Sequence, residues 1–262
     1  MRFPKKSLGQ NFLIDKNIII KIVSLVKVKN NHIIEIGPGK GALTDEILKQ
    51  KPKSLVIIEK DEDLSFKLKE KYSKNKAVKV ITADILKFNF EQIVSKNTII
   101  FGNLPYNISS QILIKILKIK DWPPFFSGLI LMFQKELGEK IIGKFETKHY
   151  GRISIFVNFR LKFIKKFLVS NNCFFPKPKV KSQVIYFKPK KESKFSIRDI
   201  NNLEKITHIF FSNKRKMINK KIKGILSDNQ IKRLKEIKLN LRPTDLRPEL
   251  YYKITELYEE IR

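Results

Sequence analysis

The chain has 262 residues, 42% hydrophobic and 11% aromatic, a composition that excludes a disordered chain and suits one large domain with a smaller second one. No apolar run approaches the ~18 residues of a membrane span, and the single cysteine, Cys173, excludes an intrachain disulfide and fits a reducing cytoplasm. The formal net charge of +30, from 55 Lys and Arg against 25 Asp and Glu, predicts a polyanionic partner, most simply nucleic acid.

A basic and polar arm, KKSLGQNFL at residues 5–13, precedes the first predicted helix. Asp15 is placed to cap that helix, and apolar residues from Ile18 to Val26 recur at helical spacing. By composition alone the arm is a solvated tail, so it contributes no functional prediction by itself. The chain starts without the apolar core of a secretory signal, and we therefore expect a cytoplasmic protein.

The first predicted strand, residues 33–36, runs into the glycine turn Gly37-Pro38-Gly39-Lys40-Gly41 and then a helix over 42–50. Glycines at the carboxyl end of a strand permit a sharp turn and let a ligand approach the backbone closely. The motif is weak evidence alone, because any tight turn from strand to helix favours glycine. It therefore needs support from the strands that follow.

The next two strands each end in an acidic residue. Strand 55–58 ends in Glu59, about 20 residues after the glycine turn, where related folds carry the acceptor for ribose hydroxyls. Glu59 is equally well explained as a surface residue leading into a charged helix over 61–72. Strand 78–84 ends in Asp84, and aspartate is also common in turns and caps.

The fourth strand, residues 98–101, leads into the stretch FGNLPY. Gly102 and Pro105 end the strand and stiffen the loop. The loop offers the side-chain amide of Asn103, backbone carbonyls without ladder partners and the ring of Tyr106, which together suit a flat ring bearing an amine, such as adenine. Polar groups after four successive strands predict one ligand site at a common edge of a parallel sheet.

After FGNLPY, predicted helices and strands continue to alternate, and the last part of the chain is predicted to contain helices alone. We expect helices over 109–118, 134–143 and 153–159 and strands over 128–133, 161–169 and 182–187. The loop 174–180 contains two prolines and is predicted to present Phe174 as an aromatic face. The polar run 188–194 marks a linker, and helices are expected over 201–211, 214–226, 228–235 and 248–259.

Basic residues crowd the predicted helix over 214–226, at Lys214-Arg215-Lys216 and at Lys220-Lys221. They form either a solvated face or a surface that contacts phosphates, and the charge of the whole chain favours the second interpretation. We expect no metal site, because three scattered histidines and one cysteine cannot complete a zinc set. Cys173 is interpreted as a small buried residue and not as a nucleophile.

Together these motifs resemble the small-subunit (16S, KsgA-type) ribosomal RNA adenine-N6,N6-dimethyltransferase family. The matching stretches run in order along nearly the whole chain: KKSLGQNFL, IIEIGPGKGALT, VIIEKDEDL, ITADIL, FGNLPYNIS, LMFQKE, FFPKPKVKS, FFSNKRKMINKKI and LRPTDLRPEL. The resemblance implies an α/β, Rossmann-like, S-adenosylmethionine (SAM)-dependent methyltransferase domain at 1–188. It also implies a small all-α domain at 195–262 that contacts RNA or the ribosome.

The same resemblance implies a reaction and partners. SAM would donate methyl groups to the N6 amines of two adjacent adenines, in a hairpin loop near the 3′ end of small-subunit rRNA. The partner would be the small-subunit rRNA within a 30S precursor particle. We expect a monomer that works without a metal ion and away from membranes.

Carried over from the family, the cofactor residues are those at the sheet edge and in the arm. Asn11 and Leu13 would line the SAM site, and Gly37 would lie against the methionine part. Glu59 would accept the ribose hydroxyls and Asp84 the adenine amine. Lys40 departs from the family, which usually has an apolar residue between the second and third glycines.

The residues for the target base come from two loops. Asn103 would lie where cofactor and target meet, and the Asn103 side chain and the Leu104 carbonyl would accept the two N6 hydrogens. Pro105 holds the loop, and Tyr106 and Phe174 resemble the stacking walls for the base.

Other functions remain open at this point. The large-subunit (23S) rRNA methyltransferases of macrolide resistance share the asparagine loop and the FxPKPKV loop, although LGQNFL and RPTDLRPEL favour the small-subunit branch. A ribosome-assembly factor without catalysis is disfavoured by the intact FGNLPY. A nicotinamide dehydrogenase is a distant third alternative, because the glycine turn lacks dinucleotide spacing and nothing in that function explains the charge.

Overall fold

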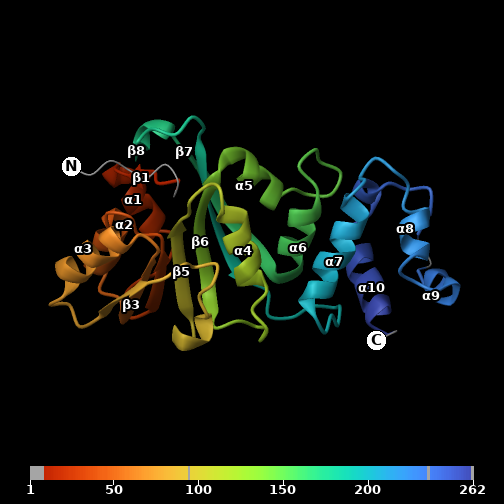
Figure 1. Cartoon of the computed structure of the whole chain (residues 1–262), viewed down its shortest axis with the longest axis horizontal. Coiled ribbons are helices and arrows are strands. Elements are labelled where there is room, and N and C mark those ends of the chain that lie inside the picture. The colour runs from red at the N-terminus through yellow and green to blue at the C-terminus, as the bar shows by residue number, and fades with distance from the viewer. Residues whose placement is uncertain (1–8, 94, 235–236, 261–262) are drawn as a thin grey trace. The chain divides into compact units, whose positions relative to one another are not determined.

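The computed structural model describes residues 9–93, 95–234 and 237–260 (Figure 1). The basic arm at 5–8 and the end of the helix predicted over 228–235 lie outside these residues. The chain divides into two compact units, one made of the chain up to Gly138 with Phe163–Pro189, the other of Glu139–Lys162 with the chain from Lys190 onward. The predicted domains group 139–162 with the catalytic part instead. The grouping differs because the helix within 139–162 packs against C-terminal helices.

A seven-stranded sheet with the order β4-β3-β2-β5-β6-β9-β7 organises the first unit. Its strands are β2 His32–Ile36, β3 Ser54–Glu59, β4 Val78–Thr82, β5 Thr98–Asn103, β6 Phe126–Gln134, β7 Leu161–Val169 and β9 Ser182–Pro189. The strands from β4 to β6 pair in parallel, and β9 pairs antiparallel with β6. This arrangement confirms the predicted α/β, Rossmann-like class.

The order of the strands places the ligand site. From β2 the chain proceeds outward through β3 and β4, then returns to β5 on the other side of β2. In such sheets a crevice opens at the carboxyl ends of the strands where the order reverses, here between β2 and β5. Ile36 pairs with Gly102 at that point, so the residues that follow the two strands are neighbours.

The helices of this unit are α1 Lys16–Val23, α2 Ala42–Lys49, α3 Glu62–Tyr72 and α4 Ser109–Leu117, and α5 Lys135–Ile141 follows β6. Figure 1 shows α1, α2 and α3 grouped near β1 and β3. Asp15 caps α1 and Asp61 caps α3, each accepting from backbone amides of the first turn. The apolar faces of α1, α2 and α3 join residues of β2, β3 and β5 in one buried cluster. Short 3₁₀ turns occur at Phe90–Ile93 and Asn171–Cys173.

A second, two-stranded sheet docks the arm. Strand β1, Phe12–Leu13, pairs antiparallel with β8, Phe174–Phe175, in the register Phe12↔Phe175 and Leu13↔Phe174. Phe12 is 9% exposed and Leu13 5%, so the interpretation of the arm as a solvated tail was wrong for these two residues. A two-residue strand shows no periodicity, and only its partner reveals it.

The second unit is helical. Its helices are α6 Arg152–Arg160, α7 Ile200–Phe211, α8 Asn219–Lys223, α9 Asp228–Lys232 and α10 Pro248–Glu259, with a 3₁₀ turn at Pro243–Asp245. Helix α7 packs against both α6 and α10, and α10 also packs against α6. Tyr252 of α10 donates a hydrogen bond to the carbonyl of Ile155 in α6, at 2.9 Å. This contact fixes α6 to the C-terminal helices.

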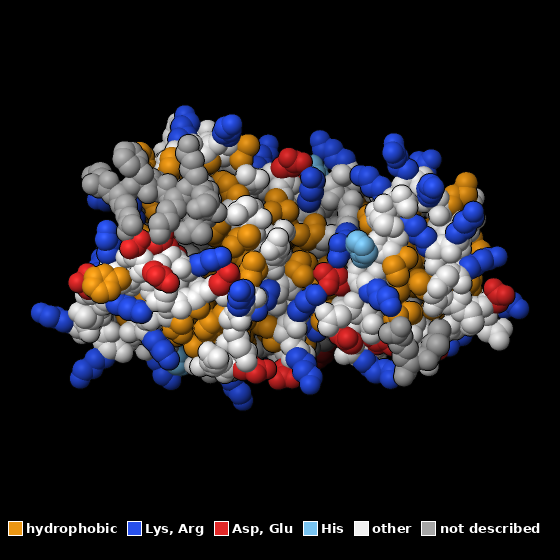
Figure 2. All heavy atoms as spheres, in the orientation of Figure 1, with side chains coloured by type: hydrophobic (Ala, Val, Ile, Leu, Met, Phe, Trp, Pro, Cys, Tyr) orange, Lys and Arg blue, Asp and Glu red, His pale blue; other side chains and the backbone are white. Residues whose placement is uncertain are grey.

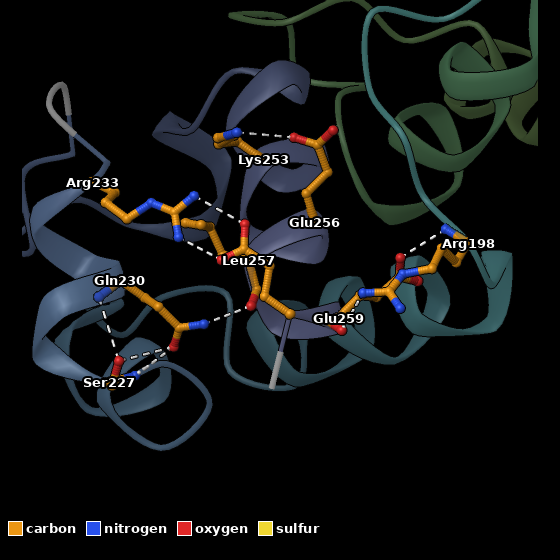
Figure 3. Close-up of polar contacts among 9 residues, drawn as sticks. Arg198, Ser227, Gln230, Arg233, Lys253, Glu256, Leu257 and Glu259 are labelled. Atoms are coloured by element: carbon orange, nitrogen blue, oxygen red, sulfur yellow. Dashed lines mark hydrogen bonds and ion pairs between the residues drawn. The ribbon is translucent and has the colours of Figure 1, made fainter. Parts of the chain in front are cut away.

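Polar contacts tie the ends of these helices together (Figure 3). The Glu259 carboxylate is 5% exposed and accepts from the backbone amides of Arg198 and Asp199, at 2.7 and 3.0 Å. Arg198 in turn donates from Nη2 to the Glu259 carbonyl at 2.7 Å. Gln230 donates to the Leu257 carbonyl at 2.6 Å. The end of α10 is therefore bonded to the start of α7 and to α9, and satisfies groups that a helix end leaves open.

The helix predicted over 214–226 is wrong in extent, because α8 covers only Asn219–Lys223. The amide of the buried Ile218 donates to the Leu241 carbonyl at 2.9 Å, so a tertiary contact takes up this amide directly before α8 begins. Lys221 donates to the Phe210 carbonyl at 2.6 Å, at the end of α7, and burial lowers its pKa. Lys221 thus serves the fold, whereas Lys220 is exposed.

Basic side chains are scattered over the visible face of the molecule (Figure 2). Blue Lys and Arg side chains extend from most parts of this face, and red Asp and Glu side chains are fewer. Among the residues that the structure describes, no helix is both long and apolar enough to cross a bilayer. Within the same residues, no three His, Cys, Asp or Glu side chains gather as a metal site would require.

Candidate functional site

A cavity of about 370 Å³ opens at the carboxyl ends of β2, β3 and β5. It is lined by every residue predicted for the site except Phe174, namely Asn11, Leu13, Gly37, Glu59, Asp84, Asn103, Leu104, Pro105 and Tyr106. The volume is within the range of small-molecule and cofactor sites. The polar residues that follow the parallel strands thus meet at one place, as the order of the motifs predicts.

The glycine turn closes one side of this cavity. Gly37 and Gly39 have φ of +68° and +60°, in the left-handed region that favours glycine. A Cβ on Gly39 would lie 2.7 Å from Cδ1 of Phe12, which leaves no room for a side chain. The arm therefore lies directly on the turn. Lys40, the departure noted in the sequence, places its Nζ 5.0 Å from the centre of the Phe12 ring.

Glu59 accepts two backbone hydrogen bonds at the edge of the cavity. Its Oε1 accepts from the amide of Asp61 at 2.9 Å, and its Oε2 accepts from the amide of Gly39 at 3.2 Å. Burial raises the pKa of Glu59, and these hydrogen bonds oppose the rise. An ionised carboxylate has about four acceptor positions, so Glu59 keeps acceptor capacity for a hydroxyl group of a ligand.

Asp84 lines the same cavity and lies beside a cation. Its Oδ2 is 2.8 Å from Nζ of Lys60, and its Oδ1 accepts from the amide of Leu86 at 2.9 Å. The Lys60 ammonium holds the pKa of Asp84 below its usual value. Asp84 is therefore an ionised acceptor at neutral pH, suited to the amine of a purine.

Asn103 is held by the arm. Its side-chain Nδ2 donates to the backbone carbonyl of Asn11 at 3.1 Å, and Asn11 in turn donates to the carbonyl of Gly9 at 3.2 Å. Because its donor end is bonded to the arm, the amide turns its Oδ1 the other way. No described residue donates to that oxygen or to the Leu104 carbonyl. Two acceptors thus stand together in the loop.

Tyr106 lies beside them with its hydroxyl 2.5 Å from Oγ of the buried Ser182. Burial raises the pKa of Tyr106, so the phenol stays neutral. Phe174 does not join this group: it is 3% exposed and packs within the core of the unit. Its neighbour Phe175 is 53% exposed. Of the two side chains predicted to stack on the target base, Tyr106 lines the cavity and Phe174 does not.

Glu35 is a cavity residue that the sequence reasoning missed. It is fully buried, accepts from Oγ1 of Thr44 at 2.6 Å, and desolvation raises its pKa to about 8. The sequence does contain a feature that could have identified this residue. Glu35 lies inside the apolar strand IIEI, where the carboxyl group of a glutamate must enter the protein interior. At neutral pH this residue is largely the neutral acid.

We expect Glu35→Gln to stabilise the protein more at pH 8 than at pH 5. The folded pKa of about 8 exceeds the ordinary 4.5, so the wild type loses stability as pH rises between these values. The slope is about 1.4 kcal/mol per pH unit, and glutamine imitates the neutral acid throughout. Urea unfolding at pH 5, 6.5 and 8 measures the difference. Glu62→Gln, at an exposed position, is the control. A difference that stays constant with pH for Glu35→Gln would show that this carboxyl is ionised in the fold.

Known proteins are similar to this chain in sequence. A family model described as ribosomal RNA adenine dimethylase matches residues 2–260. The chain is 46% identical to the Ribosomal RNA small subunit methyltransferase A of Pelagibacter ubique, with 98% of each chain covered. It is 40% identical to the protein of that name from Malacoplasma penetrans, over 96% of this chain and 91% of the relative.

Solved structures share the fold. A dimethyladenosine transferase from Plasmodium falciparum has a TM-score of 0.74 at 24% identity, covering 93% of this chain and 95% of that one. The 23S rRNA methyltransferase ErmE has a TM-score of 0.68 at 22% identity, covering 95% and 99%. At these identities the likeness concerns the fold, and it extends over both units of the chain.

Proposed function

Because the chain belongs to the ribosomal RNA adenine dimethylase family, we propose that it dimethylates the N6 amines of two adjacent adenines in small-subunit rRNA, with SAM as methyl donor. The observation that carries the proposal is the pair of acceptors formed by Asn103 Oδ1 and the Leu104 carbonyl, beside a cavity fit for the cofactor. The relatives named for the small subunit favour that rRNA. We place the reaction in the cytoplasm, on a precursor of the small subunit, with the protein acting as a monomer.

The hydrogen-bond acceptors that line the cavity suit the polar groups of SAM. Glu59 would accept the two ribose hydroxyls, and Asp84 the exocyclic amine of the cofactor's adenine. Asn11 and Leu13 would line the site from the arm, and Gly37 would lie against the methionine part. When bound there, SAM supplies an electrophilic methyl group on a sulfonium.

The residues of the chain then act by position. The N6 lone pair of adenine is delocalised into the ring, which makes the amine a poor nucleophile. If Asn103 Oδ1 and the Leu104 carbonyl accept the two N6 hydrogens, the nitrogen moves toward tetrahedral geometry and its lone pair localises. This mechanism relies on positioning and electrostatics and needs no strong base. In each transfer an N6–C bond would form as the S–C bond of the donor breaks, and N6 would release one proton to water. One hydrogen therefore remains after the first transfer, and the second proceeds with one acceptor contact fewer.

Tyr106 would hold the target base. An adenine must leave its stack to reach the cavity, which costs a few kcal/mol. Stacking on an aromatic ring offsets part of that cost. The hydrogen bond to Ser182 fixes the phenol end of Tyr106, so its ring has a defined orientation. The burial of Phe174 supports a packing role at the pairing of β8 with the arm, in place of the contact with the target base that the sequence predicts.

The decisive experiment is mass spectrometry of small-subunit and large-subunit rRNA after incubation with the protein and isotopically labelled SAM. We expect two adjacent N6,N6-dimethyladenines near the 3′ end of the small-subunit rRNA. Label in large-subunit rRNA alone would favour the macrolide-resistance type of enzyme. Binding of rRNA without transfer of label would favour an assembly factor that lacks catalysis.

A further inference from the structure

The segment Phe175–Lys181, here called the basic loop, joins an exposed aromatic ring to exposed cations. Phe175 is 53% exposed, and Val180 is 44% exposed. Lys177, Lys179 and Lys181 are exposed, and the loop contains no acidic residue. An isolated exposed apolar residue needs no explanation, but an aromatic ring among cations matches the composition of surfaces that bind single-stranded nucleic acid.

The basic loop lies at the edge of the cavity, and both its ends are fixed there. Phe175 stands directly opposite Phe12 in the β1–β8 pair, so the two side chains project from the same face of this ladder. Phe12 lines the cavity. At the other end of the loop, Ser182 is bonded to Tyr106, which also lines the cavity. A chain leaving the cavity on this side would meet the loop.

The charges of the loop are open to a ligand. No described carboxylate lies within ion-pair distance of Lys177, Lys179 or Lys181. Lys40, over the Phe12 ring, adds a further cation on the same side of the ladder. An acidic protein segment would satisfy the cations but would leave the ring of Phe175 unused. A single-stranded RNA satisfies both, because it carries a phosphate and a flat base in every residue.

We propose that Phe175 stacks on the unpaired base next to the target adenine, while the lysines of the basic loop contact the flanking phosphates. The inference rests on the proposed function, since it assumes an adenine turned into the cavity. Turning out that adenine exposes the face of its neighbour, and an aromatic ring at the rim replaces the lost stack. The contact tolerates any base, so it contributes affinity and places the target without reading sequence.

The test uses an RNA hairpin of the small-subunit type with 2-aminopurine on one side or the other of the target adenine. The fluorescence of this base is quenched when it stacks. We expect Phe175→Ala to bind the hairpin about tenfold more weakly and to lose the quenching at one of the two positions, since stacking on an aromatic side chain contributes about that much. Phe175→Trp should restore both. Val180→Ala, an exposed apolar residue of the same loop, is the matched control and should bind like the wild type.

Three further measurements separate stacking from other roles. SAM affinity should be the same in Phe175→Ala and the wild type; a loss would mean that Phe175 only supports the arm through Phe12 and would overturn the proposal. The salt dependence of RNA binding should be unchanged in Phe175→Ala and shallower in Lys177→Gln, because only the lysine displaces counterions.

Wild-type binding and quenching in Phe175→Ala, or failure of Phe175→Trp to restore them, would also overturn the proposal. If the wild type transferred no methyl groups but showed the quenching, the proposed function would fail and the stacking contact would stand.

Discussion

The Asn103→Ala variant is expected to lose about 10²–10³-fold in turnover on small-subunit rRNA while it binds SAM with nearly wild-type affinity. The alanine removes the side-chain acceptor and leaves only the Leu104 carbonyl to hold N6, so the lone pair of the target is no longer aligned. The cofactor contacts that we propose for Glu59 and Asp84 come from other strands and should remain. Single-turnover transfer from labelled SAM and calorimetry of SAM binding measure the two quantities separately.

The matched control for Asn103 is Asn158→Ala. The Asn158 side chain is exposed on α6, where alanine is well tolerated, and it lies in the other compact unit. This variant should transfer methyl groups like the wild type. If Asn103→Ala did so as well, the role proposed for the Asn103 amide would be refuted, whatever its SAM affinity.

Glu59→Ala is expected to weaken SAM binding by about a hundredfold, because the variant would lose the two hydrogen bonds that we propose between the ribose hydroxyls and this buried carboxylate. The same carboxylate holds the amides of Gly39 and Asp61, so the turn around the cofactor also loses support. Since burial raises the pKa of Glu59, SAM affinity in the wild type should fall as pH drops toward that pKa and the carboxylate takes up a proton. Calorimetry between pH 5 and 8 measures both effects.

Glu62→Ala, at an exposed position three residues later, serves as the control for this variant and should bind SAM normally at every pH. The variant Glu59→Ala should also show little dependence of affinity on pH, because the titrating group is gone. Unchanged SAM affinity in Glu59→Ala would place the ribose elsewhere in the cavity.

Much of the sheet could be predicted because its strands are short apolar runs bounded by turn residues. The residues at 37, 59, 84 and 103 end or follow such strands, and parallel pairing brings the ends of successive strands to one edge. Sequence order therefore determined which residues meet. The interior carboxyl of Glu35 broke the apolar pattern and marked the place where the prediction was incomplete.

The errors concern elements that depend on distant partners. Phe174 and Phe175 are the same residue type in succession, and only the register with the arm decides that Phe174 turns into the core. Helix α8 begins only at Asn219, because the amide of Ile218 is bonded to the Leu241 carbonyl, a contact with no local signature. Lys221 belongs to a run of basic residues in the sequence, yet its side chain donates a hydrogen bond to a backbone carbonyl at the end of α7. In each case a tertiary contact overrides a local preference that is itself weak.

The β1–β8 ladder has a thermodynamic consequence for how the two ligands act together. Two paired residues form a ladder that is marginal by itself, and the arm depends on it. Asn11 and Leu13 line the cavity that we propose for the cofactor, and the exposed Phe175 belongs to the surface that we propose for RNA. Either ligand, once bound, would order the ladder in advance for the other. Since such coupling is reciprocal, we expect SAM to increase the affinity for RNA by the same factor that RNA increases the affinity for SAM.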